Sequence, residues 1–159
     1  MKRIIACAAL ATAFVAGNAS ALEMRPVLTL DLAKKMAAAC EARAMQEGWK
    51  MNIAVMDAGG NLVYFQRMDN AYLKSIEISM LKASTSAGLP FSTKTVEDIA
   101  KTRVPGIAYV PGIATFEGGL PVMTAGGAHI GSIGVSGAAA SDDGKCAQAG
   151  LDAIAEDLK

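Results

Sequence analysis

The stretch from Gly118 to Gly137, GGLPVMTAGGAHIGSIGVSG, decides the fold of this chain. Two apolar segments, LPVMTAG and HIGSIGVSG, are separated by a Gly-Gly-Ala turn, and apolar residues alternate in both segments as they do in half-buried strands. Glycine permits the positive φ that a tight turn requires. The stretch therefore predicts an antiparallel hairpin. It holds seven glycines in twenty residues and also His129, the only histidine of the chain.

A phosphate-binding loop is a weaker interpretation of the same glycines. A dinucleotide fingerprint places its glycines between a strand and a helix, so that the pyrophosphate rests on the helix N-terminus. Here Gly131 and Gly134 fall inside the strand-like alternation, and no Walker lysine follows. Glycines within a strand mark a bulge, or a place where another backbone or a flat ligand comes close. We therefore expect structural glycines, with a ligand beside them as a hypothesis.

The segments around this hairpin predict helices and a second hairpin. Strands that arrive as hairpins form an antiparallel sheet, which makes the chain α+β rather than doubly wound α/β. The elements expected outside the glycine-rich stretch are a helix over 29–48 capped by Thr29, two strands within 51–68, a helix from Ser75 to Gly88, a short helical turn and loop over 92–106, and a helix over 141–158 capped by Ser141, with Asp142 and Asp143 in its first turn.

The N-terminal residues predict a secretory signal over residues 1–21. Lys2 and Arg3 precede the apolar run IIACAALATAFVA, and Ala19-Ser20-Ala21 has the small-x-small form of a cleavage site. The apolar run is shorter than the roughly 20 residues that a membrane-spanning helix needs. We expect a periplasmic or secreted single domain over residues 22–159, with no membrane segment in its mature form.

The charge balance argues against nucleic-acid binding. The whole chain has 15 Lys and Arg residues against 15 Asp and Glu residues. Removal of the signal would take Lys2 and Arg3 and leave the domain slightly acidic. Nucleic-acid binding relies on clustered Lys and Arg that displace counterions. We expect a small molecule as the partner instead.

Two cysteines, Cys40 and Cys146, remain after the predicted signal. In an oxidising compartment, an even pair of cysteines is a candidate disulfide. Equally, both thiols could be small buried apolar groups on separate helices. The sequence leaves these two alternatives open, because it does not give the Cα separation.

Four motifs together resemble the GlcG/HbpS family: RMDNA, LKAST, EGGLPV, and HIGSIGVSG followed by a helix that starts with aspartates. This family includes extracytoplasmic haem-binding proteins and the C-terminal domain of PduO-type proteins. The resemblance implies a five-stranded antiparallel sheet with helices packed on it, in the order α-β-β-α-(α)-β-β-β-α. It also implies homo-oligomers, haem binding, and in some members slow haem degradation or iron storage.

Haem iron takes an axial His, Cys, Met or Tyr, and its propionates suit a fixed cation. Some similar haem-binding proteins ligate haem through a histidine on the first helix, but this chain has none there. The alternatives to a ligand role are a solvated histidine at a strand end and ordinary surface charges. The candidate haem- or ligand-binding residues are Arg67, Asp69, Tyr72, Lys82, Gly118, Gly119, Pro121 and His129.

The sequence and the resemblance favour a secreted small-ligand-binding protein, with a tetrapyrrole such as haem as the expected ligand and scavenging or sensing as its role. Binding is favoured over turnover, because the sequence offers no pair of titratable groups placed for acid–base work. Two alternatives stay open. One is an enzyme with slow haem degradation or other small-molecule chemistry in the same pocket, and the other is a cofactor-free oligomeric accessory protein.

Overall fold

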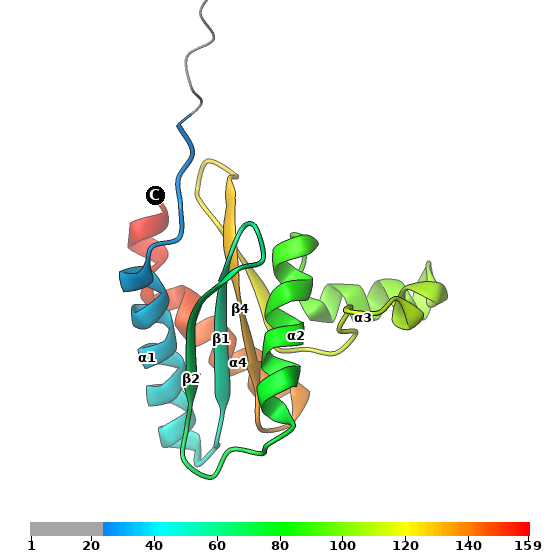
Figure 1. The fold of residues 1–159 in the computed structure, drawn as a ribbon, viewed down its shortest axis with the longest axis horizontal. Helices are drawn as coiled ribbons and strands as arrows, with labels where there is room; N and C mark the ends of the chain where they lie inside the picture. Colours follow the sequence, from blue (N-terminus) through cyan, green and yellow to red (C-terminus); the bar gives the residue numbers. More distant parts are fainter. Residues whose placement is uncertain (1–23) are drawn as a thin grey trace, which may run out of the picture.

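Residues 24–159 are described by the structure, a computed structural model (Figure 1). The signal predicted over residues 1–21 lies outside this range. The elements in chain order are α1 (Leu30–Glu47), β1 (Asn52–Asp57), β2 (Leu62–Arg67), α2 (Ser75–Gly88), α3 (Thr93–Thr102), the 3₁₀ helix η1 (Pro105–Tyr109), β3 (Gly119–Met123), β4 (His129–Ser136), α4 (Ala140–Ala153) and the 3₁₀ helix η2 (Ala155–Leu158).

The strands form one antiparallel sheet in the order β2-β1-β4-β3. Both predicted hairpins are confirmed, since β1 pairs with β2 and β3 pairs with β4. Asn52 lies opposite Arg67 on one side and Ser136 on the other, at what we call the Arg67 end of the sheet. His129 begins β4 at the opposite end, which we call the His129 end.

The prediction of five strands, and of the element order that went with it, is wrong. Within residues 24–159 the sheet has four strands, and two strands rather than three follow α3. The segment between α3 and β3 contains Pro105 and Pro111, and proline has no N–H to donate to a sheet ladder. This segment forms η1 and an irregular loop instead of a strand. Before it, α3 is a full helix capped by Ser92, where only a short turn was expected.

Helices α1 and α4 cover one face of the sheet, and α2 covers the other (Figure 1). The large apolar side chains of the central strands point toward α1 and α4. There they form the main core with the small residues of α1 that the sequence placed on one face, Ala33, Ala37, Cys40 and Ala44. Cys40 and Cys146 are disulfide-bonded across this layer, with a Cα–Cα distance of 4.7 Å. The disulfide alternative is therefore the correct one.

Small residues allow α2 to lie close on the opposite face. Ala54 of β1 packs against Ala83 of α2, and the Ser132 hydroxyl donates to the Ala83 carbonyl at 2.7 Å. A Cβ on Gly134 would lie 2.2 Å from the Ser79 carbonyl oxygen and 2.3 Å from the Ala83 nitrogen. This strand glycine therefore accommodates the backbone of α2.

Two helices begin differently from the prediction. Ser75 is the first residue of α2 rather than its cap, and its hydroxyl donates to the Tyr72 carbonyl at 2.6 Å. Helix α4 begins at Ala140, so Ser141 lies inside it. Among the described residues, no helix combines the length and the apolar character needed to cross a membrane.

Candidate functional site

The eight candidate residues do not form one site. Their positions along the paired strands divide them between the two ends of the sheet and its interior. His129 and Ser136 are seven residues apart on β4, so the two ends are separated by about 23 Å at the usual strand rise. Arg67, Asp69 and Tyr72 lie at the Arg67 end, and His129 lies at the His129 end. Lys82, Gly118 and Gly119 meet in the interior. Pro121 lies within the edge strand β3.

The Arg67 end carries exposed side chains around a shallow hollow. Arg67 and Asp69 are exposed, and Tyr72 is 72% exposed. The hollow, of about 300 Å³, is lined by Gly48, Trp49, Lys50, Asn70, Tyr72, Gly137 and Ala138. Tyr72 is therefore the one candidate of this group that borders a cavity, and its phenol is a second axial candidate.

Lys82 is buried in an ion pair and is not the surface charge that the sequence allowed. Its Nζ donates to Asp143 Oδ2 at 2.6 Å and to the Val135 carbonyl at 3.1 Å. The Phe116 ring lies over the same ammonium at 4.8 Å from the ring centroid. The other carboxylate oxygen of Asp143 accepts hydrogen bonds from the backbone N–H groups of Gly137 and Ala138. Both charges of the pair are thus satisfied inside the protein.

Burial dominates the electrostatics of this pair. Desolvation lowers the pKa of Lys82 despite the attraction of Asp143, and it raises the pKa of Asp143 despite the attraction of Lys82. Gly118 and Gly119 lie against the same lysine, and a Cβ on Gly118 would come within 2.6 Å of its Nζ. These glycines give the lysine and the strand backbone room, so the lysine, Gly118 and Gly119 form a packed structural cluster.

A groove lies at the His129 end, between the N-terminal segment and the two hairpin turns. Its volume is about 560 Å³, within the usual range for small-molecule sites. The lining residues that the structure describes are Met24, Arg25, Pro26, Val27, Ala58, Ala128 and His129. Five of these seven side chains are apolar. A smaller hollow of about 210 Å³ adjoins it and shares Pro26, Val27 and Ala58.

Among the candidates, His129 is the one that lines a cavity and also has a buried polar atom without a partner among the described residues. Its Nε2 is buried and has no hydrogen-bond partner among the residues that the structure describes. A buried polar atom without a partner costs free energy, so it calls for a ligand, a water or an ion. The same nitrogen is the atom through which histidine ligates haem iron.

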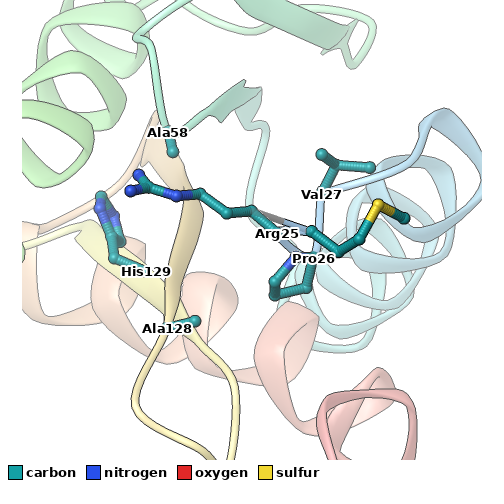
Figure 2. A pocket seen from close by; sticks show the side chains of 7 residues that line it. Arg25, Pro26, Val27, Ala58, Ala128 and His129 are labelled. Carbon is teal, nitrogen blue, oxygen red and sulfur yellow. The ribbon is translucent and has the colours of Figure 1, made fainter. Parts of the chain in front are cut away.

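Arg25 is a groove residue that the sequence analysis did not single out. Figure 2 shows its side chain extending across the groove toward the His129 ring, with Ala58 and Ala128 on the two turns beside it. Arg25 lies between the predicted signal and α1, where the sequence has no periodic pattern to indicate contacts. Only the folded arrangement brings it close to His129.

The turn that carries Ala58 is held by Asp57. Its Oδ1 accepts hydrogen bonds from the backbone N–H groups of Gly59 at 2.8 Å and Asn61 at 2.9 Å, and the Asn61 amide also donates to the carboxylate. The hydrogen bonds from Asn61 hold the pKa of Asp57 below its usual value. This turn is therefore a well-defined wall of the groove. Among residues 24–159, no group of three His, Cys, Asp or Glu side chains is placed to hold a metal ion.

Comparison with known proteins gives matches along most of the chain. The family model described as "Haem degrading protein HbpS-like" matches residues 28–152. Protein GlcG of Escherichia coli K12 is 32% identical over 115 residues, which cover 72% of this chain and 85% of GlcG. The family-model match covers the β3–β4 hairpin and both cysteines of the disulfide.

Two solved structures share the fold. A double mutant of HbpS from Streptomyces reticuli has a TM-score of 0.79 and 31% identity, with 91% of this chain and 98% of that chain covered. The PduOC–haem complex has a TM-score of 0.74 and 26% identity, with 81% and 96% covered. The second of these proteins was therefore crystallised with haem.

Proposed function

This chain belongs to the HbpS-like family, described as haem-degrading, and from that premise we propose that it binds haem in the groove at the His129 end. The observation that carries the proposal is the buried His129 Nε2, which lacks a partner among the described residues and belongs to a side chain that lines a mostly apolar cavity. The haem complex of the similar PduOC domain supports the choice of ligand.

The residues of the groove fit haem. The apolar side chains of Met24, Pro26, Val27, Ala58 and Ala128 suit the flat macrocycle, and the imidazole of His129 supplies an axial nitrogen. When bound, haem would supply an iron centre whose reactivity depends on that axial ligand and on the polarity of the groove. In such a complex, the chain would contribute the imidazole of His129 and the apolar walls of the groove.

Binding for scavenging or sensing is the role that these residues support best. The described lining of the groove holds one imidazole and one guanidinium, and no carboxylate or thiol to work with them in acid–base chemistry. The match to a family described as haem-degrading favours haem degradation as the second candidate function. Degradation predicts that the Soret band of the bound haem decays over time when a reductant and oxygen are supplied, whereas binding alone predicts a stable band.

A haemin titration followed by the Soret band tests the proposal. We expect a saturable, shifted band in the wild-type protein, which His129→Ala weakens at least tenfold and moves in wavelength. Tyr72→Ala is the matched control, because Tyr72 borders the hollow at the other end of the sheet. A band that is lost in Tyr72→Ala and kept in His129→Ala would move the site to the Arg67 end. No saturable shift at micromolar haemin would overturn haem binding and favour the cofactor-free accessory role.

Export to the periplasm or the exterior is part of the proposal. Its support is the signal-like sequence over residues 1–21 together with the Cys40–Cys146 disulfide, a bond typical of oxidising compartments. N-terminal sequencing of the protein from cell fractions tests it. A mature chain that begins at Leu22 outside the cytoplasm is the expected result, and an uncleaved cytoplasmic chain would contradict it.

Self-association is also proposed. Helix α3 and the segment after it project from the body of the fold (Figure 1), and they expose apolar side chains such as Val104, Tyr109 and Val110. Exposed apolar surface of this kind is typical of an interface. Light scattering after size exclusion is expected to give a mass of two or more chains, and Tyr109→Lys is expected to lower it. A monomer at all concentrations would contradict self-association.

A further inference from the structure

The segment from Met24 to Val27, which we call the strap, forms one whole wall of the groove. Its four residues all line the cavity, whereas the rest of the fold contributes Ala58, Ala128 and His129. The strap side chains are exposed, with Met24 93% and Val27 70% exposed. The next residue, Leu28, is buried in the main core and fixes the strap to the body.

The strap places a permanent positive charge over an apolar cavity. Arg25 is the only charged residue, apart from the titratable His129, among the described residues that line the groove. Its side chain extends toward the His129 ring (Figure 2).

An arginine and an imidazole on one apolar groove recognise two different parts of a ligand. The imidazole nitrogen suits a metal or a hydrogen-bond donor, and the planar guanidinium suits a carboxylate, which it can bind through two parallel hydrogen bonds. A flat apolar ligand with a carboxylate at its edge could contact the imidazole, the guanidinium and the apolar walls of the groove at the same time.

We propose that Arg25 is the carboxylate-binding residue of the groove and that the strap selects flat ligands that carry a carboxylate over those that do not. The inference rests on the proposed function, because it assumes that the groove at His129 is the haem site. For haem, the carboxylates are the propionates. Hydrogen bonds to charged groups have a strength that corresponds to about a tenfold to hundredfold change in affinity.

The experiment compares haemin with haemin dimethyl ester, whose propionates carry no charge. Both are titrated into the wild-type protein, Arg25→Gln, Arg25→Lys and the control Arg103→Gln, an exposed arginine at the end of α3. Arg25→Gln is expected to weaken haemin binding about tenfold to hundredfold and to leave binding of the ester within about twofold. Arg25→Lys is expected to restore part of the affinity, and Arg103→Gln to change neither ligand.

The outcomes separate the inference from the proposed function. If Arg25→Gln leaves haemin affinity unchanged, or weakens haemin and the ester equally, the carboxylate role of Arg25 is overturned while haem binding stands. If the wild-type protein shows no saturable band with haemin, haem binding and the carboxylate role are overturned together. A Soret maximum that stays at its wild-type wavelength in Arg25→Gln is expected, because the axial nitrogen of His129 is intact in that variant.

Discussion

The ammonium of Lys82 lies 2.6 Å from the carboxylate of Asp143, although their helices pack on opposite faces of the sheet. Both side chains are almost fully buried, at 1% and 3% exposure. The pair therefore joins α2 to the first turn of α4 around the end of β4. Because Asp143 also accepts from Gly137 and Ala138, one carboxylate fixes the strand, the loop after it and the helix.

Removing one partner of this pair is expected to destabilise the fold strongly. Lys82→Met leaves the Asp143 carboxylate buried without its cation, and breaking a buried pair in this way typically costs about 3–5 kcal/mol. Urea denaturation measures the change in the free energy of unfolding. Lys94→Met, at an exposed position on α3, is the matched control and should change the free energy of unfolding by less than about 0.5 kcal/mol.

The double variant Lys82→Met/Asp143→Leu tests how much of the destabilisation in Lys82→Met comes from the unpaired Asp143 carboxylate. It should be less destabilised than Lys82→Met, because no unpaired charge remains. The recovery will be incomplete, since the N–H groups of Gly137 and Ala138 lose their acceptor. A double variant that is less stable than Lys82→Met would show that the carboxylate matters mainly through those backbone bonds.

Gly134→Ala is expected to be poorly tolerated. The new Cβ would lie 2.2 Å from the Ser79 carbonyl and 2.3 Å from the Ala83 nitrogen, and a helix backbone cannot move aside as a side chain does. We expect a loss of about 1–3 kcal/mol or more in thermal or urea unfolding. Gly88→Ala is the control, because a Cβ there meets nothing within 4 Å. Equal stability of the two variants would contradict the close approach of α2.

The Cys40–Cys146 disulfide is expected to contribute about 2–4 kcal/mol to the free energy of unfolding. The double variant Cys40→Ala/Cys146→Ala should therefore have a lower urea midpoint than the wild type. Both cysteines are fully buried, so a reductant should act on the wild type mainly after unfolding and should not affect the variant. Insensitivity of the wild-type midpoint to reductant under equilibrium conditions would contradict a stabilising disulfide.

Acid is expected to loosen the β1–β2 turn through Asp57. The pKa of this carboxyl is held below its usual value in the folded protein, so its stabilising effect is complete above the ordinary aspartate pKa of 3.8. That stability is lost as the pH falls from there through the lowered pKa, where the folded protein takes up the proton. Between pH 5 and pH 3, the urea midpoint should fall by more in the wild type than in Asp57→Ala. Parallel losses in both proteins would assign the acid sensitivity to other carboxyls.

Local features of the sequence were enough to predict most of the elements. The cap at Thr29, the stop at Gly48 and the small residues of α1 predicted that helix and its buried face correctly, because capping and periodicity act within a few residues. The two hairpins followed from alternation and glycine-rich turns in the same way. The family resemblance was confirmed as well, but the fifth strand that it implied does not occur in residues 24–159, where prolines precede β3.

The candidate site was predicted only in part, because a site depends on contacts between distant segments. His129 was among the eight candidates, but its orphaned nitrogen and its groove depend on the strap and on two turns that meet only in the folded chain. Arg25 carried no pattern that would indicate its place in that groove. Lys82 had the charge of a ligand-binding residue, and only the structure shows that Asp143 already engages it.

The sequence by itself determined the α+β class, the positions of the hairpins, the first helix and the family, since all of these depend on residue order and local conformational preference. The tertiary structure decided the number of strands, the Cys40–Cys146 bond, the burial of Lys82 and the groove that brings Arg25 to His129. These features depend on distances between residues far apart in the chain. Packing around the sheet sets those distances, and no short stretch of sequence encodes them.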